Sequence, residues 1–436
     1  MSSGRGARRA GRPAMPKEAH FITHRKGSIA LARAALAATL LLAAAPSRGG
    51  PPPHWVDAAA ISPAAYELPT LPPRLAALAD RFRPGPPVTG TVRVRMYLST
   101  GGAQLRVRFT NEAGTQPFTI EAASVALAAA DSDDARGPVK RLTFGGRPSI
   151  TLAPRAPALS DPVDIATTAM SEVVISVYVP GGVAFNPAGG MAMTAAAGNQ
   201  TAIGHMPAAT PLVGRPLVSG LQVATARPVS TIVTLGDSIT DGARTQRGDL
   251  RGWPEALARR FAPGPAHAVL NAGIAGGYVL TSWWGDGALA RLDRDALRVP
   301  GLSNLVVLEG INDISTSGGS EVLGPRPEIT AEDLIAGYRQ IIARAHLLNV
   351  KVIGATLTPF KGAPPYSRAK EVIRLAVNRW IRTSGEYDAV IDFEAVLRDP
   401  AHPENLRAEF DSGDHLHPNA KGYQAMADAI DLRVFK

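Results

Sequence analysis

No cysteine occurs among the 436 residues of this sequence. Disulfides, catalysis by a thiolate and zinc sites built from cysteine ligands are therefore excluded. The lack of disulfides does not argue against export, because a chain of this length can bury large hydrophobic cores without covalent cross-links. With 45% hydrophobic and 19% charged residues, the composition indicates a globular protein, long enough for two domains.

Net charge is nearly absent outside the first 50 residues. The formal charge of the chain is +9, but residues 1–50 hold nine Lys or Arg and one Glu, which account for eight of those charges. A nearly neutral body gives no electrostatic reason to bind nucleic acid or a membrane surface.

Long apolar runs are also scarce. Residues 34–45 (AALAATLLLAAA) form a run of 12 after a basic stretch, which suits the hydrophobic region of an export signal and falls short of a bilayer span. With a cleavage site at Ala43-Ala44-Ala45, residues 1–45 are predicted to be the signal peptide of a secreted or periplasmic protein. An uncleaved anchor is the alternative, and no other run is long enough to span a membrane.

Two patterns divide the remaining chain. Residues 46–87 are predicted to be a Pro-rich linker and lead-in, because Pro and Gly there favour extended chain. Residues 88–226 are predicted to be an antiparallel β-sandwich, jelly-roll-like, because apolar and polar residues alternate between turn signals. The expected strands are 91–98, 105–109, 118–120, 149–152 and 173–179.

Residues 227–436 instead alternate short apolar runs with helical patterns, which predicts a parallel sheet covered by helices on both faces. In an open sheet of this kind, ligands bind at the carboxyl ends of the strands. The expected strands are 230–235, 268–270, 305–308, 351–357 and 390–392, and the expected helices are 253–261, 330–348 and 366–384.

A serine stands at the end of the first of these strands, in Gly236-Asp237-Ser238. At the mouth of the next helix its hydroxyl faces the crevice, and its amide lies where negative charge is stabilised. Ser238 can therefore be a nucleophile; a simple helix N-cap is the alternative.

A base for that serine is available near the C-terminus. A serine nucleophile needs an imidazole and a group that orients it, and Asp414 and His417 are close enough for one turn to hold both. His415 is interpreted as an exposed loop residue. The alternative is a metal site formed by Asp237, Asp414, His415 and His417.

Two more loops follow predicted strands. In Gly310-Ile311-Asn312-Asp313, the Asn312 amide can donate to a developing oxyanion, although a turn-forming Asn-Asp pair is the alternative. In residues 271–277, a glycine amide can approach a substrate closely, although a plain Gly-rich loop is the alternative. The second loop lacks the Lys-Ser/Thr ending of a phosphate loop.

In their order, these blocks resemble the SGNH, or GDSL, hydrolase superfamily: Gly236-Asp237-Ser238, Gly276, Gly310-Ile311-Asn312-Asp313 and Asp414-x-x-His417. The resemblance covers about residues 229–436. It implies a three-layer α/β/α, flavodoxin-like domain with serine esterase activity and no metal or cofactor.

The resemblance also implies a role for each residue. Ser238 would attack the acyl carbon, His417 would be its base and Asp414 would orient His417. The backbone amides of Ser238 and Gly276, with the Asn312 side chain, would form the oxyanion hole, and Asp237 would brace the turn. In many members of the superfamily a polar residue follows the glycine that corresponds to Gly276, whereas Gly277 follows it here. Gly273 is therefore the alternative to Gly276 as an oxyanion donor.

The preceding half resembles a subgroup of bacterial acylhydrolases with an added β-rich domain, through residues 108–112 and 142–146. Related two-domain enzymes include esterases that deacetylate plant-wall polysaccharides. The expected substrate is therefore an ester of a short acyl group, acetyl, carried by a polysaccharide or by a small molecule. The alternatives are a lipid or aryl acylhydrolase, a thioesterase, a non-catalytic glycan-binding protein and a metal-dependent phosphoesterase.

Two further features concern the substrate. Trp283 and Trp284, beside Gly285-Asp286-Gly287, are candidate sugar-stacking residues, with core packing as the alternative. The Gly/Ser/Pro-rich loop 315–328 is expected to shape the pocket or act as a lid. The sequence does not predict an oligomeric state.

Overall fold

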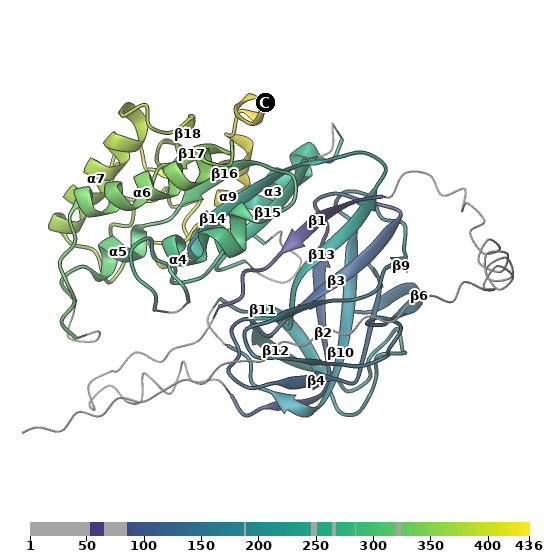
Figure 1. The fold of residues 1–436 in the computed structure, drawn as a ribbon. Coiled ribbons are helices and arrows are strands. Elements are labelled where there is room, and N and C mark those ends of the chain that lie inside the picture. Colours follow the sequence, from purple (N-terminus) through teal and green to yellow (C-terminus); the bar gives the residue numbers. More distant parts are fainter. Residues whose placement is uncertain are drawn as a thin grey trace, which may run out of the picture. The chain divides into compact units, whose positions relative to one another are not determined.

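The computed structural model describes residues 53–64, 85–186, 189–245, 251–263, 267–283, 285–319 and 324–436. The predicted signal peptide, residues 1–45, lies outside them. Pro53–Lys436 form one compact unit, in which a β-rich part precedes an α/β part (Figure 1). The two-domain boundary at 226/227 falls between the last strand of the first part and the first strand of the second.

Antiparallel strands build the β-rich part, as predicted. One sheet has the order β1-β13-β3-β8, with β9 also on β3, and the other has the order β12-β11-β2-β10-β5-β6. The inward residues of both sheets, among them Val94, Val107, Ile175 and Leu221, form one hydrophobic core. The strands are β1 (His54–Ala60), β2 (Val88–Tyr97), β3 (Gln104–Thr110), β4 (Phe118–Ile120), β5 (Ala122–Ala128), β6 (Ala135–Leu142), β7 (Ile150–Leu152), β8 (Pro157–Leu159), β9 (Val163–Asp164), β10 (Glu172–Val183), β11 (Met191–Ala196), β12 (Thr210–Gly214) and β13 (Val218–Thr225).

Strand β1 corrects the expectation for residues 46–87. Part of that predicted linker pairs with β13, from His54 opposite Thr225 to Ala60 opposite Gly220. Strand β1 was not predicted because its alanines give little of the β-branched and aromatic enrichment of strands. Strand β13 was not predicted because nearly every residue there is buried, so apolar and polar positions do not alternate.

The α/β part contains a five-stranded parallel sheet, which confirms the predicted fold class. Its order is β15-β14-β16-β17-β18, so the strand order reverses at β14, as in flavodoxin-like sheets. The bounds are β14 (Ser230–Gly236), β15 (His267–Gly273), β16 (Leu302–Leu308), β17 (Lys351–Ala355) and β18 (Ala389–Ile391). All five lie where apolar runs predicted them.

Helices cover this sheet in two groups, α3 with α8 and α9, and α4 to α7 (Figure 1). Helix α6 begins as predicted, with Thr330 and Asp333 forming a reciprocal capping box. The helices are α2 (Ser238–Asp241), α3 (Trp253–Phe261), α4 (Ala288–Leu292), the π-helix η2 (Asp293–Leu297), α5 (Ile311–Thr316), α6 (Ala331–His346), α7 (Arg368–Thr383), α8 (Phe393–Leu397), α9 (Ala420–Asp428) and the 3₁₀-helix η3 (Leu432–Phe435).

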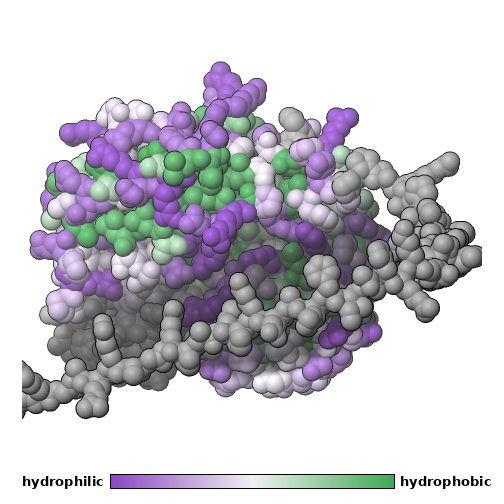
Figure 2. Space-filling model, viewed as in Figure 1, coloured by the Kyte–Doolittle hydropathy of each residue, from purple (hydrophilic) through white to green (hydrophobic). Residues whose placement is uncertain are grey.

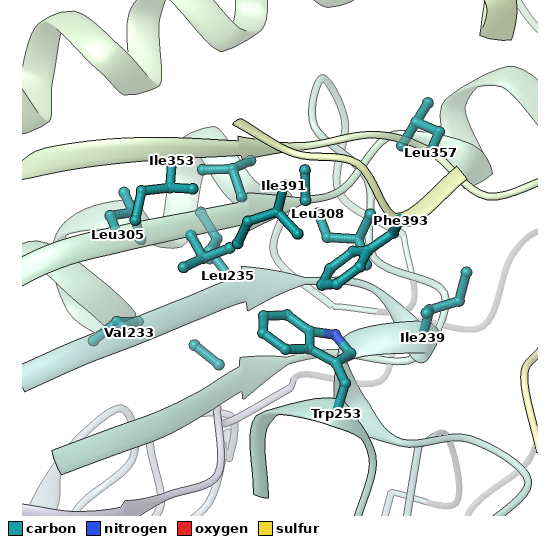
Figure 3. Close-up of a cluster of buried hydrophobic side chains, with 14 of the residues drawn as sticks. Val233, Leu235, Ile239, Trp253, Leu305, Leu308, Ile353, Leu357, Ile391 and Phe393 are labelled. Carbon is teal, nitrogen blue, oxygen red and sulfur yellow. The ribbon is translucent and has the colours of Figure 1, made fainter. Parts of the chain in front are cut away.

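The core beneath the strand ends fixes the sheet against these helices. Strand residues such as Val233, Leu235 and Leu305 pack with the rings of Trp253 and Phe393 (Figure 3). The Trp253 and Phe393 ring centroids are 5.2 Å apart, and both side chains are fully buried. Helices α3 and α8 are thereby held against β14, the strand that leads to Ser238.

Areas of apolar residues lie among polar residues on the face in view (Figure 2). Such mixing is ordinary for a folded domain. Among the described residues, no helix has both the length and the apolar character to cross a membrane.

We expect Trp253→Ala to destabilise the protein by about 3–5 kcal/mol, since it leaves a cavity beside Phe393. The indole nitrogen of Trp253 has no hydrogen-bond partner among the described residues, so Trp253→Phe should cost much less. Thermal unfolding of both variants tests this, and equal losses would contradict it.

Candidate active site

Three loops leave the sheet at one level. In the parallel register, Gly236 at the end of β14 lies opposite Gly273 of β15 and Leu308 of β16. The residues that follow these positions include Ser238, Gly276 and Asn312. They therefore emerge from neighbouring strand ends, at the point where the strand order reverses.

The turn into α2 places Ser238 at the first helical position. Asp237 is the N-cap and accepts a hydrogen bond from the Ile239 amide at 2.9 Å, so Asp237 braces the turn and the N-cap interpretation of Ser238 is wrong. A Cβ at Gly236 would lie 2.2 Å from Thr240 Oγ1, which is why glycine is needed there.

Ser238, His417 and Asp414 form a continuous hydrogen-bonded chain. Ser238 Oγ lies 2.7 Å from His417 Nε2, and His417 Nδ1 lies 2.7 Å from Asp414 Oδ2. The Ser238 and His417 side chains are 179 positions apart in sequence, and Ser238 is 8% exposed. A nucleophile, a base and an orienting carboxylate therefore meet without any rearrangement.

The carboxylate of Asp414 stabilises the loop that carries His417. Asp414 Oδ1 accepts hydrogen bonds from the amides of Leu416 at 3.0 Å and His417 at 2.9 Å. The amide of Ser412 donates to the His417 carbonyl at 3.1 Å, which closes the loop. Asp414 thus fixes both the backbone and the ring of His417.

Asp414 remains ionised for a clear electrostatic reason. Burial works to raise its pKa, but the hydrogen bonds and charge of His417 outweigh burial and hold the pKa of Asp414 well below its usual range. Arg244 Nε also donates to Asp414 Oδ2 at 2.9 Å, a contact that the sequence analysis missed. No motif marks Arg244, although its positive φ of 69° places it in a tight turn.

His415 belongs to a separate pair. Its Nδ1 lies 2.6 Å from Asp411 Oδ2, and half of its side chain is exposed. Within the described ranges, no group of three or more His, Asp or Glu residues is placed to hold a metal ion.

The predicted oxyanion donors follow the ends of three neighbouring strands. Gly276 has a φ of +74°, a conformation that favours glycine. Asn312 Nδ2 donates one hydrogen to the Gly277 carbonyl at 2.9 Å, which orients the amide and leaves its second hydrogen for another acceptor. The backbone amides of Ser238 and Gly276 donate to no other group in the described part of the chain.

Buried carboxyl groups lie behind these loops. Asp313 accepts hydrogen bonds from the amides of Val279 at 2.8 Å and Leu280 at 3.0 Å, so it ties α5 to the chain after Gly276. Burial raises the pKa of Asp313 to about 6, although these two amides oppose the shift. Burial likewise raises the pKa of Asp237 to about 7 and that of Glu309 well above its usual value.

The expectation of an exposed sugar platform is wrong for Trp283. Its side chain is 8% exposed, packs 6.1 Å from the Tyr278 ring centroid and is covered by the Arg326 guanidinium at 3.6 Å. The Trp283 ring packs against these neighbours and is not exposed, because a large indole and the planar guanidinium of Arg326 exclude water from each other's faces. Trp284 lies outside the described residues, as do 320–323 of the predicted pocket loop.

A cavity of about 730 Å³ lies between the β-rich and α/β parts. Its lining includes Met170 and Met191 from the first part and Arg244, Arg251 and Ala275 from the second. Ser238, His417 and Asp414 do not line this cavity, so it is distinct from their hydrogen-bonded chain. Arg244 both lines the cavity and donates a hydrogen bond to Asp414.

One comparison, with a family model, agrees with the family resemblance. The GDSL-like lipase/acylhydrolase family matches residues 234–425, which include Ser238, Gly276, Asn312, Asp414 and His417. A search of curated proteins found no match.

Three similar solved structures are bacterial. An acetyl xylan esterase from Geobacillus stearothermophilus is 19% identical, with 48% of this chain and 97% of that chain covered and a TM-score of 0.36. A psychrotrophic esterase from Pseudoalteromonas sp. is 19% identical, with coverage of 46% and 93% and a TM-score of 0.34. A GDSL-like lipase from Bacteroides thetaiotaomicron is 17% identical, with coverage of 47% and 87% and a TM-score of 0.36.

The raised pKa of Asp313 predicts a pH-dependent contribution to stability. The folded state holds its proton more tightly than the unfolded state, so this contribution falls by about 2 kcal/mol as pH rises from 4 to 7. The stability difference between wild type and Asp313→Asn should fall by that amount over this range.

Asp295 is the matched control. Burial opposes its ionisation, but Arg294 and Arg291 outweigh burial and lower its pKa, so its contribution is lost in acid instead. The difference between wild type and Asp295→Asn should therefore grow as pH rises out of acid. Parallel curves for wild type and Asp313→Asn in thermal unfolding would contradict the first prediction.

Proposed function

We propose that this chain, whose residues 234–425 belong to the GDSL-like lipase/acylhydrolase family, is an exported esterase that releases short acyl groups through Ser238, His417 and Asp414. Membership of that family makes it a carboxylic ester hydrolase. The observation that carries the proposed mechanism is the 2.7 Å contact between Ser238 Oγ and His417 Nε2.

The first half of the reaction forms an acyl-enzyme. His417 Nε2 takes the Ser238 proton as Oγ attacks the acyl carbon, and Asp414 stabilises the imidazolium that forms. When the tetrahedral intermediate collapses, His417 gives that proton to the leaving alcohol. In the second half, His417 activates a water that attacks the acyl carbon, and the acid leaves as Ser238 is reprotonated.

The negative charge of the intermediate needs donors that are already in place. The amides of Ser238 and Gly276 and the second hydrogen of the Asn312 amide are the proposed donors. Asn312 is held by the Gly277 carbonyl, so its amide needs no reorganisation during the reaction. Removing one such donor typically raises the barrier by about 3–4 kcal/mol.

The proposed substrate is an acetyl or similar short ester on a carbohydrate. The export signal predicted at residues 1–45 and the β-rich part support this choice, since a protein outside the cell meets acetylated polysaccharides. The sequence offers no long apolar lid for a lipid chain. Longer acyl esters and aryl esters are the second candidate, because the same machinery would hydrolyse them.

His417 and His415 form a matched pair for testing the base. Each bonds a carboxylate through Nδ1, but among the two only His417 contacts Ser238. With p-nitrophenyl acetate as substrate, His417→Ala should reduce kcat about 10⁴-fold or more. His415→Ala should retain activity near that of wild type, and Ser238→Ala should be inactive.

Loss of activity in His415→Ala but not in His417→Ala would reverse the assignment. The wild-type rate should also fall in acid, because a protonated His417 cannot accept the serine proton. A rate that stays flat far into acid would contradict a histidine base.

Substrate class is tested with a panel of esters. We expect kcat/KM to fall as the acyl chain of p-nitrophenyl esters lengthens from two to eight carbons, and acetate to be released from acetylated xylan or another acetylated polysaccharide. A preference for the longer chain without acetate release would favour the lipid or aryl-ester candidate. In that case the triad assignment would stand and the substrate proposal would fail.

A further inference from the structure

A charged side chain of the β-rich part contacts α2, the helix that carries Ser238. Arg215 directly follows β12, and its side chain is only 6% exposed. Its guanidinium bonds the carboxylate of Asp241, with Nη2 at 3.0 Å from Oδ2 and Nη1 at 3.4 Å from Oδ1. Asp241 is the last residue of α2, whose first residue is Ser238.

The same guanidinium reaches a second element of the site. Arg215 Nη2 also donates to the carbonyl of Gly273 at 3.3 Å. Gly273 ends β15, three residues before Gly276. Arg215 therefore connects the helix of the nucleophile to the start of the loop that carries a proposed oxyanion donor.

Close packing surrounds this contact. A Cβ at Gly273 would lie 2.2 Å from the Asp241 amide, so β15 is pressed directly against α2. A Cβ at Gly189, from the β-rich part, would lie 2.6 Å from Asp241 Oδ2 and 2.9 Å from Arg215 Nη2. The amide of Arg215 is itself held by the Asn186 carbonyl at 2.9 Å.

Removing Arg215 would leave Asp241 with one of its two cationic partners. Asp241 also accepts from Arg251, but that contact comes from the α/β part. A buried carboxylate that loses one cation shifts toward its remaining partner or toward water, and α2 has only four residues with which to absorb the shift. Even a small displacement of Ser238 relative to His417 and Gly276 slows acyl transfer, because the reacting atoms must be aligned.

We propose that Arg215 is a positioning residue of the esterase: acting through Asp241 and Gly273, it holds the Ser238 helix and the Gly276 loop in their reactive arrangement. The β-rich part is then a component of the active site and not only a separate binding module. This inference rests on the proposed function.

The matched control is Arg93, another buried arginine of the β-rich part. It is 2% exposed and bonds Ser176 Oγ at 2.8 Å and the carbonyls of Gly204 at 2.6 Å and Ile203 at 2.7 Å. All of these partners lie within the β-rich part. Arg93→Met and Arg215→Met therefore both remove a buried charge, but only Arg215→Met removes a contact with the α/β part.

The test compares kcat and KM for p-nitrophenyl acetate in the full chain, per mole of protein folded at the assay temperature. We expect Arg215→Met to lower kcat about 10- to 100-fold with little change in KM. Asp241→Asn should show a loss at least as large, because it also removes the ion pair with Arg251, and the double variant should be little worse than Asp241→Asn alone, since that variant already removes the ion pair with Arg215. Arg215→Lys, which keeps the charge, should recover part of kcat.

Arg93→Met should lower the melting temperature and leave kcat unchanged. A folded Arg215→Met that keeps the wild-type kcat, and so behaves like Arg93→Met, would overturn the inference. If Arg215→Met does not fold, Asp241→Asn decides, and a wild-type kcat in folded Asp241→Asn would likewise overturn it.

The failure of the proposed function is separable from the failure of this inference. A wild-type protein without Ser238-dependent ester hydrolysis would refute the proposed function. The rate at which a fluorophosphonate labels Ser238 then gives a readout that needs no ester turnover. We expect slower labelling in Arg215→Met than in Arg93→Met, and equal rates would overturn the positioning role.

Discussion

The site depends on three strand ends lying at one level, which places the nucleophile Ser238 between the loops of the proposed oxyanion donors. Parallel pairing aligns the ends of β15, β14 and β16, and the loops that follow them carry Gly276, Ser238 and Asn312. His417 arrives from outside the sheet, on a loop stabilised by Asp414. If the register of one strand slipped by a residue, the donors would no longer converge with the nucleophile.

Polar groups under the loops maintain this arrangement. Asp237 caps α2, Asp313 holds the chain after Gly276, and Asn312 is oriented by the Gly277 carbonyl. Each satisfies backbone donors or acceptors that a tight loop would otherwise leave without partners. The carboxyl groups of Asp237 and Asp313 are buried at an energetic cost, and burial raises the pKa of both. Preorganised sites commonly carry such a cost.

Sequence reasoning succeeded where the signal was local. The five strands of the parallel sheet were predicted because each is a short apolar run between turn residues. It failed where burial removes alternation or where small residues give little signal, as in β13 and β1. It also could not foresee that Arg326, more than forty residues away in sequence, would cover Trp283. The partners of Asp414, Asp241 and Trp283 include arginines that no motif singles out.

The sequence by itself determined the fold class of the α/β part and the residue types available for chemistry, because periodicity, capping and glycine turns act over a few residues. Only the tertiary structure decided which arginines contact the carboxylates of the site, Arg244 at Asp414 and Arg215 at Asp241, and it brings the predicted base His417 to Ser238. Contacts between residues so distant in sequence depend on how strands pair and helices pack. That information is spread over the whole chain and resides in no single motif.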